Sequence, residues 1–120
     1  MLGIRKFNGV AIDLFQGDVP TFSCDLEFVG LEGSPIEKTC ESALAGILAT
    51  NGRHLAVAPF LTARSSLDNE AKAALETVKS FLQNQKDKRG LRRVTFVLSS
   101  GESYRSFQDA LFSTFPDDDQ

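Results

Sequence analysis

The chain has 120 residues, 42% of them apolar and 24% charged, which suits one globular domain and is too short for two separate cores. Thirteen Lys and Arg residues against sixteen Asp and Glu residues leave a net charge of −3, so a nucleic-acid partner is not expected. Two cysteines and no apolar N-terminal segment indicate a cytoplasmic protein with reduced thiols, and no apolar run reaches the roughly 18 residues of a membrane span.

Alternating apolar residues predict two strands in the first quarter of the chain. Val10, Ile12 and Leu14 alternate with Ala11, Asp13 and Phe15 and indicate a strand with one firmly buried face. The alternation continues over 21–28, where apolar side chains occupy every second position and predict a strand near a sheet edge. We expect one domain over residues 1–120, with its core over about 9–115 and an acidic tail at 117–120.

A helix is predicted to begin within the sequence Ser34-Pro35-Ile36-Glu37. Ser34 and Glu37 have the spacing of a capping box, and Pro35 suits the first helical position. Asn51-Gly52 then indicates the end of this helix. Its apolar residues fall on one face at helical spacing: Ile36, Cys40, Leu44, Ile47 and Leu48.

The second half of the chain repeats a strand and helix pattern. Residues 55–58 are four apolar residues in a row, as in a central strand, and 94–98 predict another buried strand. Amphipathic helices are expected over 68–82 and over 104–115. This order predicts an α/β fold with a mostly parallel sheet and helices on both faces, which is a three-layer α/β/α architecture.

Ligands of such sheets bind outside the carboxyl ends of the strands, so the loops at that edge are the candidates for a binding site. They are residues 17–20, 29–34, 59–66 and 99–103. These loops carry glycines, hydroxyls and the guanidinium of Arg64, and helix N-termini there favour anions such as phosphate. A purely structural interpretation also stands, in which Ser34, Ser65 and Ser66 are helix caps and the glycines form turns.

No arrangement of catalytic or metal-binding residues emerges from the sequence. His54 is the only histidine and is expected at the opposite edge of the sheet, so we interpret it as an ordinary surface or rim residue. Cys24 and Cys40 fall on apolar faces and are interpreted as small buried hydrophobic residues. The basic run over 86–93 is interpreted as a solvated helix end. The sequence contains neither a dinucleotide fingerprint nor a P-loop, and we expect no cofactor and no metal.

Several segments resemble the macro domain, the ADP-ribose-binding fold. Residues 12–19, with Gly17-Asp18-Val19 at their end, resemble its strand closed by Gly-Asp-Ile. Residues 53–62 and the helix over 68–82 resemble the strand and helix around its second phosphate loop, and 92–107 resemble its last strand and helix. The similarity touches about residues 9–115, and the chain is similar to a shortened, degenerate member of this family.

The resemblance implies roles for residues in three loops. Asp18 would accept a hydrogen bond from the adenine amino group, with the backbone of Val19 beside it. Gly33 and Ser34 stand where the family has a glycine loop, and the second phosphate loop is replaced by residues 62–66. The ligand-binding candidates are Asp18, Val19, Gly33, Ser34, Thr62, Arg64 and Ser65.

The family's asparagine that supports hydrolysis is absent, because Val29-Gly30-Leu31-Glu32 replaces the Asn-Ala-Ala-Asn stretch. De-ADP-ribosylating activity is therefore not expected. Two function classes stay open. In the first, the domain binds ADP-ribose or another adenine nucleotide or phosphorylated ligand without catalysis, and Arg64 either contacts phosphate or fills the crevice. In the second, the ligand site is lost and the domain is an interaction or homo-oligomerisation module, with a homodimer as its expected form.

Overall fold

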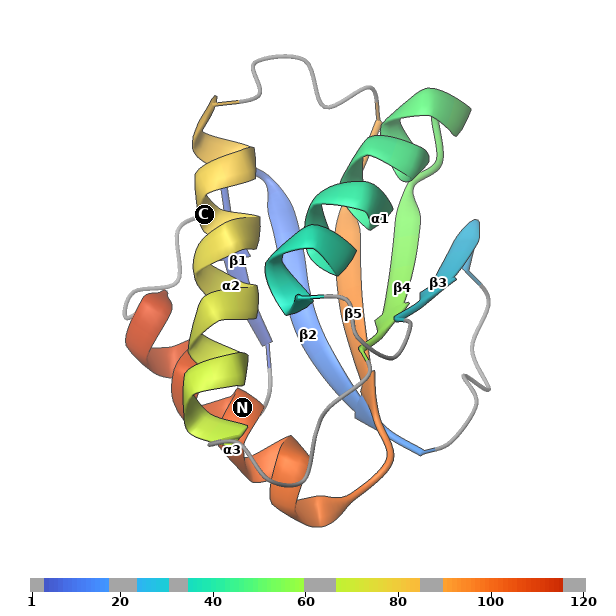
Figure 1. Ribbon diagram of the computed structural model, residues 1–120. Coiled ribbons are helices and arrows are strands. Elements are labelled where there is room, and N and C mark those ends of the chain that lie inside the picture. The colour runs from blue at the N-terminus through green and yellow to red at the C-terminus, as the bar shows by residue number, and fades with distance from the viewer. Residues whose placement is uncertain (1–3, 18–23, 31–34, 60–66, 85–89, 116–120) are drawn as a thin grey trace.

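The computed structural model of the protein describes residues 4–17, 24–30, 35–59, 67–84 and 90–115 (Figure 1). These residues form a five-stranded sheet and three helices. The elements in chain order are β1 (Ile4–Phe7), β2 (Val10–Gln16), β3 (Leu26–Val29), α1 (Ile36–Thr50), β4 (His54–Ala58), α2 (Leu67–Asn84), β5 (Arg93–Leu98) and α3 (Gly101–Thr114).

The sheet is mixed and mostly parallel, as the alternation of strands and helices predicts. Its strand order is β1-β2-β5-β4-β3. β2, β5, β4 and β3 are mutually parallel, and only β1 pairs antiparallel, with β2. The α/β class is therefore confirmed, and the predicted strands and helices of the second half of the chain are all present.

β1 is a strand that the sequence interpretation above does not include. It forms a hairpin with β2, in which Phe7 is paired with Val10 and the two intervening residues form the turn. Asn8 and Gly9 both have positive φ, at 53° and 80°. Asn-Gly is the residue pair that a tight two-residue hairpin prefers, because both positions require a left-handed backbone. This pair was the signal in the sequence for the extra strand.

The three described helices all pack on one face of the sheet, which differs from the predicted helical layers on both faces. Figure 1 shows α1 and α2 side by side in front of the strands. The ring centroids of Phe107 in α3 and Phe96 in β5 are 5.3 Å apart. Phe96 points to the same face of the sheet as the apolar side chains that pack against α1 and α2, so α3 lies on that face too. The order β3, β4, β5 steps across the sheet in one direction, and right-handed crossovers in one direction place their helices on the same side.

The core lies between this face and the helices. Every second residue of β2, β4 and β5 points into it, and each helix contributes one apolar stripe. The predicted stripe of α1 is confirmed, since all five of its residues are buried, and Cys40 is 1% exposed. α1 begins at Ile36, and Pro35 is its extended N-cap, not its first helical residue as predicted. The helix ends with Asn51 in the left-handed conformation, as predicted.

Hydrogen bonds of Asp25 connect the start of β3 to the start of β4. One of its carboxylate oxygens accepts hydrogen bonds from the backbone N–H groups of Arg53 and His54, at 2.7 Å and 3.0 Å. The Asp25 amide in turn donates to the His54 carbonyl at 2.9 Å. The two backbone hydrogen bonds, from Arg53 first and then His54, hold the pKa of Asp25 below its ordinary value of 3.8.

We predict that Asp25 contributes a stability term that depends on pH. A carboxyl group whose pKa is lower in the folded state stabilises the fold above its unfolded pKa, and this contribution is lost as the pH falls through the folded value. The wild-type protein should therefore be more stable than Asp25→Asn near neutral pH, and the difference should shrink below pH 3.8. Urea unfolding of both proteins at several pH values measures this difference in the free energy of unfolding. A difference that is constant with pH would contradict the assignment.

Candidate functional site

The carboxyl ends of the parallel strands meet at one edge of the sheet, in the lower part of Figure 1. β2 and β5 are neighbours there, and the Gly17 amide donates to the Leu98 carbonyl at 2.8 Å. The chain leaves these two strands in opposite directions. From β2 it goes to β3 at the far edge of the sheet, whereas from β5 it enters α3, which packs beside β1 and β2. Such a reversal point is where open α/β sheets form their ligand crevices.

The start of α3 forms one side of this reversal point. The Ser100 hydroxyl caps the helix by accepting from the Ser103 amide at 3.1 Å, and it also donates to the Ser103 hydroxyl at 2.9 Å. A methyl group built on Gly101 would lie 3.7 Å from the side-chain nitrogen of Gln16, so β2 and the α3 terminus are close neighbours. This confirms the predicted turn at Ser99-Ser100, whereas Gly101 is already the first residue of α3.

The seven predicted ligand-binding residues lie outside the described residues. They are Asp18, Val19, Gly33, Ser34, Thr62, Arg64 and Ser65. What the structure does describe is where their loops begin. Gly17, Gly30 and Pro59 directly follow the last residues of β2, β3 and β4 at the same edge, and the Gly30 amide donates to the Ala58 carbonyl at 2.8 Å. The three loops thus leave from a common edge of the sheet.

A polar network that sequence reasoning missed crosses β2, β5 and β4 on the face away from the helices. The Arg93 guanidinium forms an ion pair with Asp13, and its Nε donates to the carboxylate at 2.9 Å. The Thr95 hydroxyl donates to the other carboxylate oxygen of Asp13. His54 Nε2 lies 2.8 Å from the same hydroxyl. Because the single hydroxyl proton of Thr95 points to Asp13, the hydroxyl oxygen accepts from the imidazole, which requires the tautomer with a proton on Nε2.

The register of the sheet explains why these residues meet. Asp13 is paired with Thr95, and His54 is paired with Arg93, so all four point to one face at the strand period. Asp13 is 7% exposed, and its position inside an otherwise apolar strand was the signal available in the sequence. His54 is the first residue of β4 and is half-buried, which agrees with its interpretation as a rim residue, but its hydrogen bond to Thr95 was not predicted. The network joins three strands and satisfies its buried polar groups, which is a structural role.

Asp13→Ala is predicted to destabilise the protein by about 1–3 kcal/mol, because it leaves the buried Thr95 hydroxyl and part of the Arg93 guanidinium without their acceptor. Denaturant unfolding measures the loss. Asp109→Asn, which removes an exposed carboxylate from α3, is the matched control and should change stability by less than about 0.5 kcal/mol. Equal effects of the two substitutions would show that the network does not stabilise the sheet.

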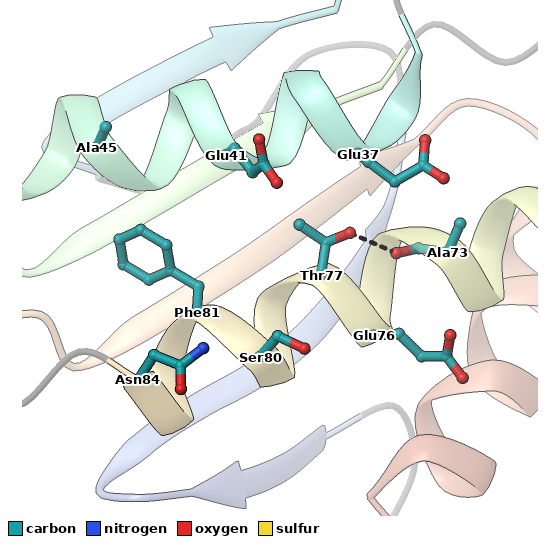
Figure 2. A pocket seen from close by; sticks show the side chains of 9 residues that line it. All are labelled: Glu37, Glu41, Ala45, Ala73, Glu76, Thr77, Ser80, Phe81 and Asn84. Carbon is teal, nitrogen blue, oxygen red and sulfur yellow. Dashed lines mark hydrogen bonds between the residues drawn. The ribbon is translucent and has the colours of Figure 1, made fainter.

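A groove of about 660 Å³ lies on the outer side of the helical layer, between α1 and α2 (Figure 2). Glu37 and Glu41 lie along its α1 rim, and Glu76 comes from α2. The Thr77 hydroxyl in its wall donates to the Ala73 carbonyl at 2.8 Å. The other residues that line the groove are uncharged: Ala45, Ala73, Ser80, Phe81 and Asn84. This groove is on a helix face, away from the carboxyl edge.

The two cysteines are free thiols in different environments. Cys40 is buried in α1, and burial, with smaller contributions from the Glu37 and Glu41 carboxylates, raises its pKa to about 12. Cys24 is only partly buried, and its pKa is raised by burial and then by Glu27 and Asp25. The prediction that cysteines act as buried apolar residues is confirmed for Cys40 and holds in part for Cys24.

Native-state alkylation is predicted to distinguish the two thiols. The thiolate is the reactive form, so Cys40, which is buried and has a pKa of about 12, should react with iodoacetamide only when the protein unfolds. Cys24 should react faster in the folded protein. Mass spectrometry of peptides after timed alkylation measures both rates. Equal rates in the folded state would show that α1 does not bury Cys40 as described.

Comparison of the sequence with protein-family models and with curated proteins gives no significant match. Within the described ranges, no group of three or more His, Cys, Asp or Glu side chains could hold a metal ion. None of the helices that the structure describes is both long and apolar enough to cross a membrane.

Proposed function

We propose that this chain is a shortened macro-like domain of the cytoplasm, and that it binds ADP-ribose or another adenine nucleotide at the carboxyl edge of its sheet without catalysis. The observation that carries the proposal is the reversal point between β2 and β5. Asp18 immediately follows Gly17 in the sequence, and Gly17 is the first residue after β2 and donates to the Leu98 carbonyl. In the sequence, the residue expected to recognise adenine therefore directly follows a strand that ends at the edge where open α/β folds bind ligands.

The electrostatics of this edge favour an anionic ligand. α1, α2 and α3 each follow a parallel strand, so all three begin at the carboxyl edge (Figure 1). The amino end of a helix carries a partial positive charge and unsatisfied N–H groups, which suit phosphate oxygens. Arg64 lies in the sequence between β4 and α2, and it is the positively charged residue of that connection.

Asp18→Ala is predicted to abolish the thermal stabilisation that adenine nucleotides give to the wild-type protein. A ligand that binds only the folded state raises its stability by about 2.7 kcal/mol at a hundredfold excess over the dissociation constant. Thermal shift and calorimetric titrations with ADP-ribose, AMP, ADP and inorganic phosphate measure it. Stabilisation by none of these ligands would contradict nucleotide binding and favour the interaction module.

Arg64→Ala separates the two roles open to the guanidinium. If Arg64 contacts phosphate, the substitution should weaken ADP binding by about tenfold or more, as expected for a charge-assisted hydrogen bond. The affinity for phosphate-free adenosine should then be unchanged. If the affinity for ADP rises, Arg64 fills the crevice in the free protein and is not a phosphate ligand.

A further inference from the structure

The groove between α1 and α2 has two chemically different halves. Figure 2 shows Glu37 and Glu41 toward the amino ends of the two helices, and Ala45 opposite Phe81 toward their carboxyl ends. α1 and α2 are parallel neighbours, so the change from acidic to apolar follows the direction of both helices. Phe81 is only partly buried, although its inner side packs against the core. The groove therefore offers the Phe81 ring and Ala45 among the uncharged Ser80 and Asn84 at one end, and negative charge at the other.

The three groove carboxylates are exposed and have no cationic partner within the described part of the chain. Glu37 lies in the first turn of α1, where the helix dipole favours an acidic residue. Glu41 and Glu76 lie beyond the first turns of their helices, so the dipole does not account for them. Glu37 and Glu41 also repel each other, because like charges four residues apart destabilise a helix by about 0.2–0.5 kcal/mol. A cation bound between them would remove this repulsion.

We propose that this groove is a docking site for a cationic amphipathic helix of a partner protein, with basic side chains on Glu37, Glu41 and Glu76 and an apolar side chain against Ala45 and Phe81. The three carboxylates of the groove favour a positively charged partner segment. The apolar half distinguishes a protein segment from a small polycation, which would gain nothing from Phe81. This site is separate from the proposed nucleotide site and does not depend on it.

The spacing of the groove defines the pattern of residues in the partner. Glu37 and Glu41 are one helical turn apart, about 5–6 Å between Cβ atoms. Two Arg or Lys residues at positions i and i+4 of a partner helix have the same spacing and can face both carboxylates. A leucine or methionine one further turn along would then reach the apolar half. This is the helix-in-groove mode of recognition, in which a few anchors at helical spacing carry the affinity.

The test uses the full chain and a helical peptide of about four turns, with Arg at positions i and i+4 and Leu at i+8. A second peptide of the same length has Glu in place of both Arg residues. Amide chemical shifts locate the bound peptide, and fluorescence anisotropy measures its affinity at about 0.15 M salt. The Arg peptide should shift amides along the facing sides of α1 and α2, and the Glu peptide should not bind.

Two variants and a control connect the binding to the groove. Glu37→Gln/Glu41→Gln should weaken Arg-peptide binding by about tenfold, since it removes both carboxylates that face the two Arg residues and each exposed ion pair contributes up to about 1 kcal/mol. Ala45→Lys should abolish binding while keeping the fold, because the new ammonium stands four residues after Glu41, a spacing that stabilises a helix. Asp109→Asn removes one carboxylate from α3, outside the groove, and should leave the affinity within about twofold.

Three results would overturn the proposal. The first is an Arg peptide that shifts no amides of α1 and α2, or shifts mainly those of another surface. The second is equal affinity for the wild-type protein and the Glu37→Gln/Glu41→Gln variant. The third is spermidine that perturbs the same amides and, at equal charge concentration, binds as tightly as the peptide, because the occupant would then be a small polycation. None of these results bears on nucleotide binding, which Asp18→Ala tests separately.

Discussion

The parallel pairing of β2 with β5 is the constraint on which the rest of the fold depends. It joins two strands that are about eighty residues apart, from Ala11 against Arg93 to Gln16 against Leu98. Apolar side chains of both strands stabilise the pairing on the helix side, and Asp13 stabilises it on the other side through Thr95 and Arg93. The buried Asp13 carboxylate contacts both Thr95 and Arg93 of β5. A register shift of one residue would turn Asp13 toward the apolar core, where it would lose these hydrogen bonds.

The same pairing determines where the chain can form sites. With β2 and β5 in contact, β4 and β3 must extend the sheet on the other side of β5, and the crossovers through α1 and α2 run in one direction. All three described helices then share one face, and adjacent parallel helices leave a groove between them. The carboxyl edge and the α1–α2 groove are thus two separate consequences of one strand order. One favours anions through helix ends, and the other favours cations through carboxylates on helix sides.

Local patterns predicted the elements well, because each is determined by its own residues. The stripe of α1, the four apolar residues of β4 and the Ser100 turn all correspond to the structure. Asn8-Gly9 also indicated a hairpin, but Ile4–Phe7 is too short and too mixed in character to predict a strand by itself. Helices on one face could not be inferred from alternation alone, since the face depends on the order in which distant strands pair. The network of Asp13 with His54 was missed for the same reason, because its members meet only when β2, β5 and β4 are in register.

The measurement that tests the account most directly is amide chemical-shift mapping of the full chain during titration with ADP-ribose. If the ligand binds at the reversal point between β2 and β5, the largest shifts should fall on Gly17 and on Ser99 to Gly101, whose amides lie at that edge. The amides that line the α1–α2 groove should be unaffected. Saturating ligand with no shifts at Gly17 and Ser99 to Gly101, or with its largest shifts on another surface, would contradict a ligand site at the carboxyl edge.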